Sequence, residues 1–189
     1  MINISNDIKI IAEIGSAHQG SQKTMKELIK ASAKAGADII KFQIYKYYFI
    51  ATEDYYQYND YKKLFFKKEI WNEFIKYTDS LGTEIAVDIL DEWGLNVIKE
   101  NKKHINYVKI TPSILFDDKL CEEIFKLNLK TFVGIGGYKA SEIESFLKKY
   151  QKYAKNIVIL LGFQSFPTSL KNINISRITY YKNKYIHFI

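Results

Sequence analysis

Charged side chains recur near the ends of the apolar runs of this sequence, where they could act together. Glu13 closes the run "IIAE", Lys41 lies within "IIKFQI", and Lys109 lies within "YVKIT". Alternate side chains of a strand share a face, so each of these charges points away from its immediate apolar neighbours. Two ammonium groups facing one carboxylate suit an anionic ligand, with phosphate or carboxylate groups as the natural partners.

Uncharged polar groups and one further carboxylate continue this pattern. Gln43 and Thr111 each lie two residues beyond a lysine, Asp88 lies near the end of "TEIAVDIL", and Gln164 follows "NIVILLG". Unpaired buried charge is costly, so such groups must pair with one another or with a ligand. In parallel α/β folds, sites are built at the carboxyl ends of the strands. The alternative is that each charge only marks where its strand emerges into solvent.

Short runs rich in β-branched residues alternate with amphipathic stretches along the chain. They predict strands at 8–15, 37–44, 83–90, 105–111, 130–136 and 156–162, and helices at 22–36, 69–81, 91–100, 117–128 and 141–154. Gly36 is placed to end the first helix, and Ser141 with Glu144 is typical of a capping box. Strict alternation of strands and helices predicts parallel βαβ units.

Two architectures are compatible with six such units. One is an open doubly wound sheet. The other is a (β/α)8 barrel of the TIM type that is incomplete and contains about six βα units, since a complete barrel takes about 250 residues. The chain has 189 residues and no break in composition, so we expect a single domain over 1–189.

Composition excludes several classes of protein. Cys121 is the only cysteine, which excludes an intrachain disulfide and a thiolate metal cluster. No apolar run approaches the roughly 18 residues of a membrane span, and the first residues lack a signal-peptide pattern, so we expect a cytoplasmic protein without a membrane partner. The formal net charge of +7 is carried mainly by scattered lysines, which favours a solvated basic surface over phosphate ligands or nucleic acid.

The segment 45–66 is densely aromatic and contains several lysines. Aromatic rings beside basic residues are typical of proteins that bind single-stranded nucleic acid, and Tyr55, Tyr56 and Tyr58 would be the stacking residues. Acidic residues interrupt the segment, and it follows the second expected strand at the functional end. These features favour a lid or an oligomer contact over a nucleic-acid-binding module.

Two motifs carry a resemblance to a known family. "AEIGSAHQGS" and "AKAGADIIKFQIYK" resemble the N-terminal signature of the sialic acid synthases (the N-acetylneuraminate synthase family), which typically reads AEIG-x-N-H-x-G and then AGAD-x-x-K-x-Q. "YVKIT", "EIESF" and "FPTSLKNIN" match later family segments in the same order, so the resemblance is collinear over essentially the whole chain. It implies a (β/α)8 barrel, commonly followed by a small antifreeze-like domain that we expect to be absent here.

The resemblance also implies an activity. Family members condense phosphoenolpyruvate with an amino-sugar aldehyde, of the N-acetylmannosamine type, in nonulosonic acid or surface-carbohydrate biosynthesis. Such an enzyme is a transferase that forms a carbon–carbon bond and uses a divalent metal, Mn or Mg. The resemblance implies catalytic roles for Glu13, Lys41 and Lys109. Together with the strand-end pattern, it marks these residues as substrate-binding: His18, Gln43, Asp88, Thr111, Ser113 and Gln164.

Several family positions carry other residues in this sequence. The metal-binding His at the end of strand six is Leu161, and the S-D-H-T motif with the second metal-binding His is not reached, so we assign no metal ligand. His187 is expected on the approach to a seventh strand, where it cannot replace the lost ligand. The strand-three motif S-T-P-F is "VDIL", which places Asp88 at the Thr position. The phosphate-contacting Ser positions after strands four and five are Pro112 and Ile135.

These observations leave three hypotheses. The first is an enzyme of the sialic acid synthase type, with its site built on the glutamate and both lysines. The second is a catalytically degenerate or split barrel fragment that binds anions or a complementing chain or forms a homo-oligomer, because six strands leave two edges that invite association. The third and least favoured is a nucleic-acid-binding module.

Overall fold

The computed structural model describes residues 8–165 and 167–184 of the chain; His187 lies outside these ranges. The chain divides into two compact units, Met1–Asn106 and Tyr107–Ile189, and each is described by itself. No helix in the described ranges is both long and apolar enough to cross a membrane.

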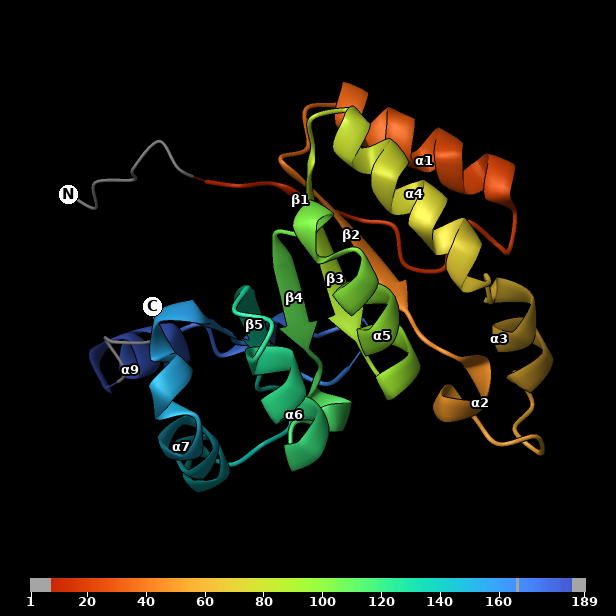
Figure 1. Cartoon of the computed structure of the whole chain (residues 1–189). Helices are drawn as coiled ribbons and strands as arrows, with labels where there is room; N and C mark the ends of the chain where they lie inside the picture. Colours follow the sequence, from red (N-terminus) through yellow and green to blue (C-terminus); the bar gives the residue numbers. More distant parts are fainter. Residues whose placement is uncertain (1–7, 166, 185–189) are drawn as a thin grey trace. The chain divides into compact units, whose positions relative to one another are not determined.

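The first unit contains three parallel strands with helices between them (Figure 1). Its elements in chain order are β1 (Ile11–Glu13), α1 (Gln22–Lys34), β2 (Ile39–Ile44), α2 (Tyr47–Ile50), α3 (Tyr58–Leu64), α4 (Lys68–Ser80), β3 (Glu84–Ile89), α5 (Glu92–Glu100) and the 3₁₀ turn η1 (Lys102–His104). In the register, Glu13 of β1 lies opposite Lys41 of β2, and Gln43 of β2 lies opposite Asp88 of β3. The carboxyl ends of the three strands therefore share one edge.

Helices α1 and α4 lie side by side and each buries one apolar face (Figure 1). Ser21 caps α1 by accepting a hydrogen bond from the amide of Thr24 at 3.2 Å, and Gly36 follows the helix in the left-handed conformation, with φ of 84°. The buried residues of the two helices are Met25, Ile29, Trp71, Phe74, Ile75 and Thr78. These helices cover the buried β-branched and aromatic side chains of β2 and β3.

The second unit also contains three parallel strands. Its elements in chain order are β4 (Tyr107–Ile110), η2 (Pro112–Ile114), α6 (Asp118–Phe125), β5 (Lys130–Gly134), α7 (Ala140–Lys149), η3 (Gln151–Asn156), β6 (Ile157–Leu160), α8 (Leu170–Ile173) and α9 (Arg177–Lys184). β4 pairs with β5, and β5 pairs with β6. Cys121 is fully buried on α6, and burial raises the pKa of its thiol to about 12, so this residue packs in the core as a neutral thiol.

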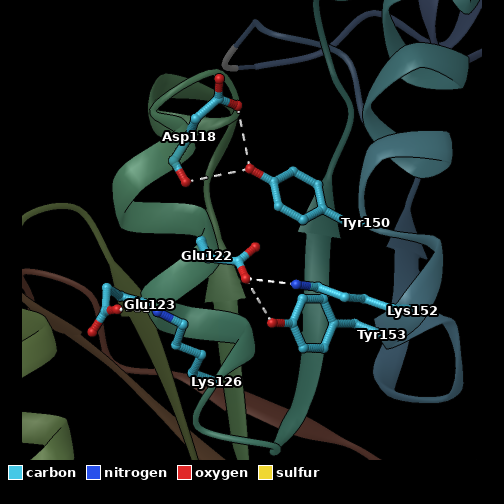
Figure 2. Close-up of polar contacts among 7 residues, drawn as sticks. All are labelled: Asp118, Glu122, Glu123, Lys126, Tyr150, Lys152 and Tyr153. Atoms are coloured by element: carbon cyan, nitrogen blue, oxygen red, sulfur yellow. Dashed lines mark hydrogen bonds and ion pairs between the residues drawn. The ribbon is translucent and has the colours of Figure 1, made fainter.

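Polar contacts join α6 to the end of α7 and to η3 (Figure 2). Tyr150 donates a hydrogen bond to the carboxylate of Asp118 at 3.2 Å. Tyr153 and Lys152 both donate to Oε1 of Glu122, at 2.9 and 2.8 Å. These contacts link the segment that leads into β6 to α6 at its accessible rim.

The predicted fold class is confirmed, because six strands alternate with helices as in a (β/α)8 barrel of which six units are present. Each predicted strand range contains an observed strand. The capping box predicted from Ser141 and Glu144 is wrong, because the N-cap of α7 is Lys139, two residues before Ser141. The amide of Lys139 instead donates to Oε2 of Glu142 at 2.7 Å, and Glu144 pairs with Lys184.

Candidate functional site

Glu13, Lys41 and Asp88 form an ion-paired cluster at the carboxyl ends of β1, β2 and β3. Nζ of Lys41 lies 3.4 Å from Oδ1 of Asp88 and also pairs with the carboxylate of Glu13. The side chains of Asp88 and Lys41 are 2% and 12% exposed, whereas that of Glu13 is 44% exposed. The structure thus brings together three of the predicted site residues, and the glutamate is the most accessible of them.

The sheet register explains this cluster. Glu13 is the last residue of β1 and lies opposite Lys41. The amide of Ile14 donates to the carbonyl of Lys41 at 3.2 Å, so the chain remains hydrogen-bonded to β2 just beyond the glutamate. Asp88 lies opposite Gln43, two residues beyond Lys41 and on the same face of the sheet. A lysine side chain between these positions reaches both carboxylates.

His18 is buried in the turn after β1, with only 4% of its surface exposed, so it is not a solvent-exposed turn residue. Its ring packs on Phe66, with 4.8 Å between ring centroids. Nδ1 accepts a hydrogen bond from the amide of Gly20 at 3.0 Å, which places the proton of the neutral ring on Nε2. Burial lowers the pKa of His18. At neutral pH the residue therefore offers Nε2–H as a hydrogen-bond donor.

A small cavity opens beside His18 within the first unit. It is lined by Gly15, His18, Gln43, Tyr45, Leu64, Phe65, Phe66 and Trp71. Its volume of about 10 Å³ leaves room for about one water molecule. His18 and Gln43 are the two predicted site residues in its lining, and Gln43 shares a face of β2 with Lys41 of the cluster.

Asp91 is a positioning residue that the sequence analysis missed. Its carboxylate accepts the amide of Gly94 at 2.6 Å, which caps α5, and the amide of Lys46 at 2.7 Å, which fixes the chain just past β2. The residue is buried, and burial raises the pKa of its carboxyl group. An Asp at the start of the helix predicted over 91–100 was the available signal, because Asp is a preferred N-cap residue.

The remaining predicted site residues lie in the second unit. Lys109 is partly buried on β4, opposite Phe132 of β5. Thr111 is buried just past β4, and its hydroxyl oxygen lies 2.8 Å from that of Ser113. Gln164 is exposed in the segment after β6. The convergence of these residues with the cluster of the first unit stays a prediction.

Apolar residues occupy three of the family positions that differ in this chain, whereas Asp88 of the cluster occupies a fourth. Leu161 lies just past β6, and Ile135 is buried, with its amide donating to the carbonyl of Leu160 at 3.2 Å. Pro112 begins η2, and its carbonyl accepts a hydrogen bond from Tyr138 at 2.5 Å. In the described ranges, no three His, Cys, Asp or Glu side chains are grouped to hold a metal ion. This donor set does not fit the divalent metal that the resemblance implies.

A wider groove of about 660 Å³ lies elsewhere in the first unit and contains none of the cluster residues. It is lined by Lys46, Phe65, Lys67, Lys68, Glu69, Trp93, Asn96, Val97, Lys99 and Glu100. Both signs of charge are present in its walls, and Lys68 pairs with Glu100 at 3.0 Å. None of the predicted site residues lines this groove, so the strand-end cluster is the better candidate site.

Comparisons with known sequences relate this chain to synthases of sugar acids. The model of the NeuB family matches residues 28–189. The N-acetylneuraminate-9-phosphate synthase of Drosophila melanogaster is 23% identical over 194 residues, which covers 95% of this chain and 52% of that protein. The N,N'-diacetyllegionaminic acid synthase of Campylobacter jejuni is 26% identical over 201 residues, which covers 93% of this chain and 57% of that protein. The chain thus spans about half the length of the curated relatives it matches.

A solved structure shows the same similarity in three dimensions. The N-acetylneuraminic acid (sialic acid) synthetase of Leptospira borgpetersenii, in complex with citrate, matches this chain with a TM-score of 0.87 and 26% identity. The match covers 95% of this chain and 62% of that one. The strand and helix order described above is therefore that of a synthase barrel.

Proposed function

Because this chain belongs to the NeuB family, we propose that it acts in a condensation of phosphoenolpyruvate with an amino-sugar aldehyde of the N-acetylmannosamine type. The matched relatives that carry the names of sialic and legionaminic acid synthases support this class of reaction. The product would be a nine-carbon sugar acid, and the protein would be a carbon–carbon bond-forming transferase.

The ion-paired cluster of Glu13, Lys41 and Asp88 is the observation that carries the proposal. A charged cluster at the carboxyl ends of parallel strands lies where barrel enzymes build their active sites. Lys41 is held in place by two carboxylates, so its ammonium group is positioned before any ligand binds. Preorganised charge of this kind stabilises a transition state without reorganisation during the reaction.

The roles of the residues follow from the net reaction. A bond forms between the methylene carbon of phosphoenolpyruvate and the aldehyde carbon, one water molecule is consumed, and inorganic phosphate leaves. Lys41, with Lys109, would offset the negative charge of the enol phosphate. Glu13 has an accessible carboxylate and would take a proton from the attacking water and return it to the aldehyde-derived oxygen. Because the described residues do not fit a divalent metal, the roles assigned here to Lys41, Lys109 and Glu13 do not depend on one.

A second candidate function is anion binding without catalysis. The observation that favours it is the replacement of polar family positions by Leu161, Ile135 and Pro112, of which Ile135 is fully enclosed in the second unit. Such a chain would retain Lys41 as a phosphate contact and would bind phosphoenolpyruvate without turning it over.

Phosphate release tests the proposed reaction. The 189-residue chain is incubated with phosphoenolpyruvate, manganese and a panel of amino-sugar aldehydes. We expect aldehyde-dependent phosphate release, which Lys41→Ala should lower by about 100-fold or more, as the loss of one preorganised charge does elsewhere. Lys23→Ala is the matched control, because Lys23 lies on α1 with its side chain 86% exposed and should leave the rate unchanged.

The two candidate functions give different results in this experiment. Release that is the same in wild type and Lys41→Ala would contradict the site assignment. Binding of phosphoenolpyruvate with no release for any aldehyde would support anion binding without catalysis.

A further inference from the structure

The ammonium group of Lys41 is committed to two carboxylates in the ligand-free protein. It pairs with Glu13 and lies 3.4 Å from Oδ1 of Asp88. In their ionised forms these three groups sum to one negative charge. A cluster that bound an enol phosphate by itself would be expected to carry the opposite sign, because like charges at such distances repel strongly in a partly buried setting.

The two carboxylates differ in their freedom to move. Glu13 ends β1, and its side chain is partly exposed, so an incoming anion can displace it from Lys41 into solvent. Asp88 projects from β3 and is almost completely covered. Removing a buried carboxylate from its cation is costly, so Asp88 stays beside Lys41 when a ligand arrives.

We propose that Asp88 is a specificity-determining residue, whose fixed carboxylate competes with anionic ligands for Lys41 and weakens the binding of phosphate. This inference rests on the proposed phosphoenolpyruvate site. It gives a physical meaning to the substitution at this position, where the family motif has an uncharged Thr. The strand-end site of this chain is accordingly weaker toward phosphate groups than one with a neutral residue here.

A purely structural role for Asp88 predicts the opposite result. If the carboxylate only holds Lys41 in place, its neutralisation lets the lysine move and anion binding weakens. If the carboxylate competes with the ligand, its neutralisation frees the charge of Lys41 and anion binding strengthens. The sign of the change therefore separates the two roles.

Titration calorimetry with phosphoenolpyruvate and with inorganic phosphate measures this sign. Asp88→Asn keeps the size of the side chain and removes its charge, and we expect its dissociation constants to fall by at least about tenfold. Glu27→Gln is the control for net charge, because Glu27 is an exposed residue of α1, and it should bind as wild type does. In Asp88→Asn combined with Lys41→Met, the gain should disappear, since it requires the ammonium group.

The outcomes separate this inference from the proposed function. If a folded Asp88→Asn binds phosphoenolpyruvate no more tightly than wild type, the inference is overturned. If Lys41→Met in the same series abolishes the binding seen with wild type, the proposed phosphate site still holds. No binding by any variant at millimolar ligand overturns both. If Asp88→Asn does not fold, Asp88→Ser provides the same test, because it also removes the charge and leaves a polar group.

Discussion

At the residue scale, the burial of His18 in the turn after β1 makes the stability of the protein depend on pH. The ring is enclosed against Phe66, and its Nδ1 accepts the amide of Gly20. Gly20 itself lies close to the end of α3, since a Cβ at this position would meet the carbonyl oxygen of Lys63 at 2.2 Å. Burial lowers the pKa of His18 below its unfolded value of about 6.5. Protonation of this ring therefore disfavours its buried position in the folded protein.

The sign of the pH effect follows from the direction of this shift. Between the lowered folded pKa and about 6.5, the unfolded chain binds more protons, so the free energy of unfolding rises with pH across that window. Stability is lost as pH falls below about 6.5, by at most about 1.4 kcal/mol per pH unit. We expect His18→Gln, which cannot be protonated, to remove this contribution.

Urea unfolding at several values between about pH 5 and pH 8 checks the expectation. The stability difference between wild type and His18→Gln isolates the contribution of His18, because the other titrating groups are common to both proteins. A difference that stays constant over this range would contradict the assignment of a buried neutral ring.

At the scale of elements, packed aromatic rings more than ion pairs should hold α6 to α7 and η3. Phe125 of α6 packs between Tyr150 and Tyr153, with ring centroids 4.8 and 5.0 Å apart, and both Phe125 and Tyr150 are buried. The ion pair of Lys152 with Glu122 in the same region joins more accessible groups (Figure 2). Apolar burial dominates over accessible charge pairs of this kind.

This difference predicts two unequal mutations. Phe125→Ala should lower the free energy of unfolding by about 3–5 kcal/mol. Lys152→Ala should lower it by no more than about 1 kcal/mol, although it removes a contact at 2.8 Å. Denaturant unfolding followed by circular dichroism measures both values, and equal losses would show that the ion pair contributes more than its exposure allows.

The elements also show what the sequence could and could not predict. Each of the six strands was predictable, because β-branched runs such as "IIKFQI" have few alternatives between polar turns. Helices α2 and α3 were not, because the aromatic residues around them lack a single periodic face. They are held instead by ring contacts such as those of Tyr47 with Tyr58 and Phe65, at 5.5 and 5.7 Å between centroids.

The candidate site was predictable to a similar extent. Alternation along each strand marked Glu13, Lys41 and Asp88 as polar strand-end residues. Their pairing depends on the register that places Glu13 opposite Lys41 and Asp88 opposite Gln43, which one sequence does not encode in any local pattern. The burial of His18 was also hidden, because it depends on Phe66, which lies far along the chain.

At the scale of the whole molecule, exposed apolar side chains gather in the segment that follows β6. Among the described residues of this segment, the large exposed apolar ones are Phe163, Leu170, Ile173, Ile175, Ile178 and Tyr180. Leu170 is 87% exposed and Ile175 is 69% exposed. Exposed apolar side chains gathered in one segment indicate an interaction surface, and covering apolar surface stabilises the associated state by about 25 cal/mol for each Å² removed from water.

We therefore expect the 189-residue chain to associate as its concentration rises, despite its net charge of +7. Leu170→Lys combined with Ile175→Lys should shift the association midpoint to at least about tenfold higher concentration, because a charge on each side chain opposes burial. Asn172→Lys combined with Thr179→Lys is the control, since it adds the same charge at exposed polar positions of this segment. Sedimentation velocity across a concentration series measures the midpoints. Equal shifts in the two double variants would show that charge repulsion, and not the loss of apolar contact, governs association. A wild-type chain that remains monomeric at every concentration would contradict the expectation.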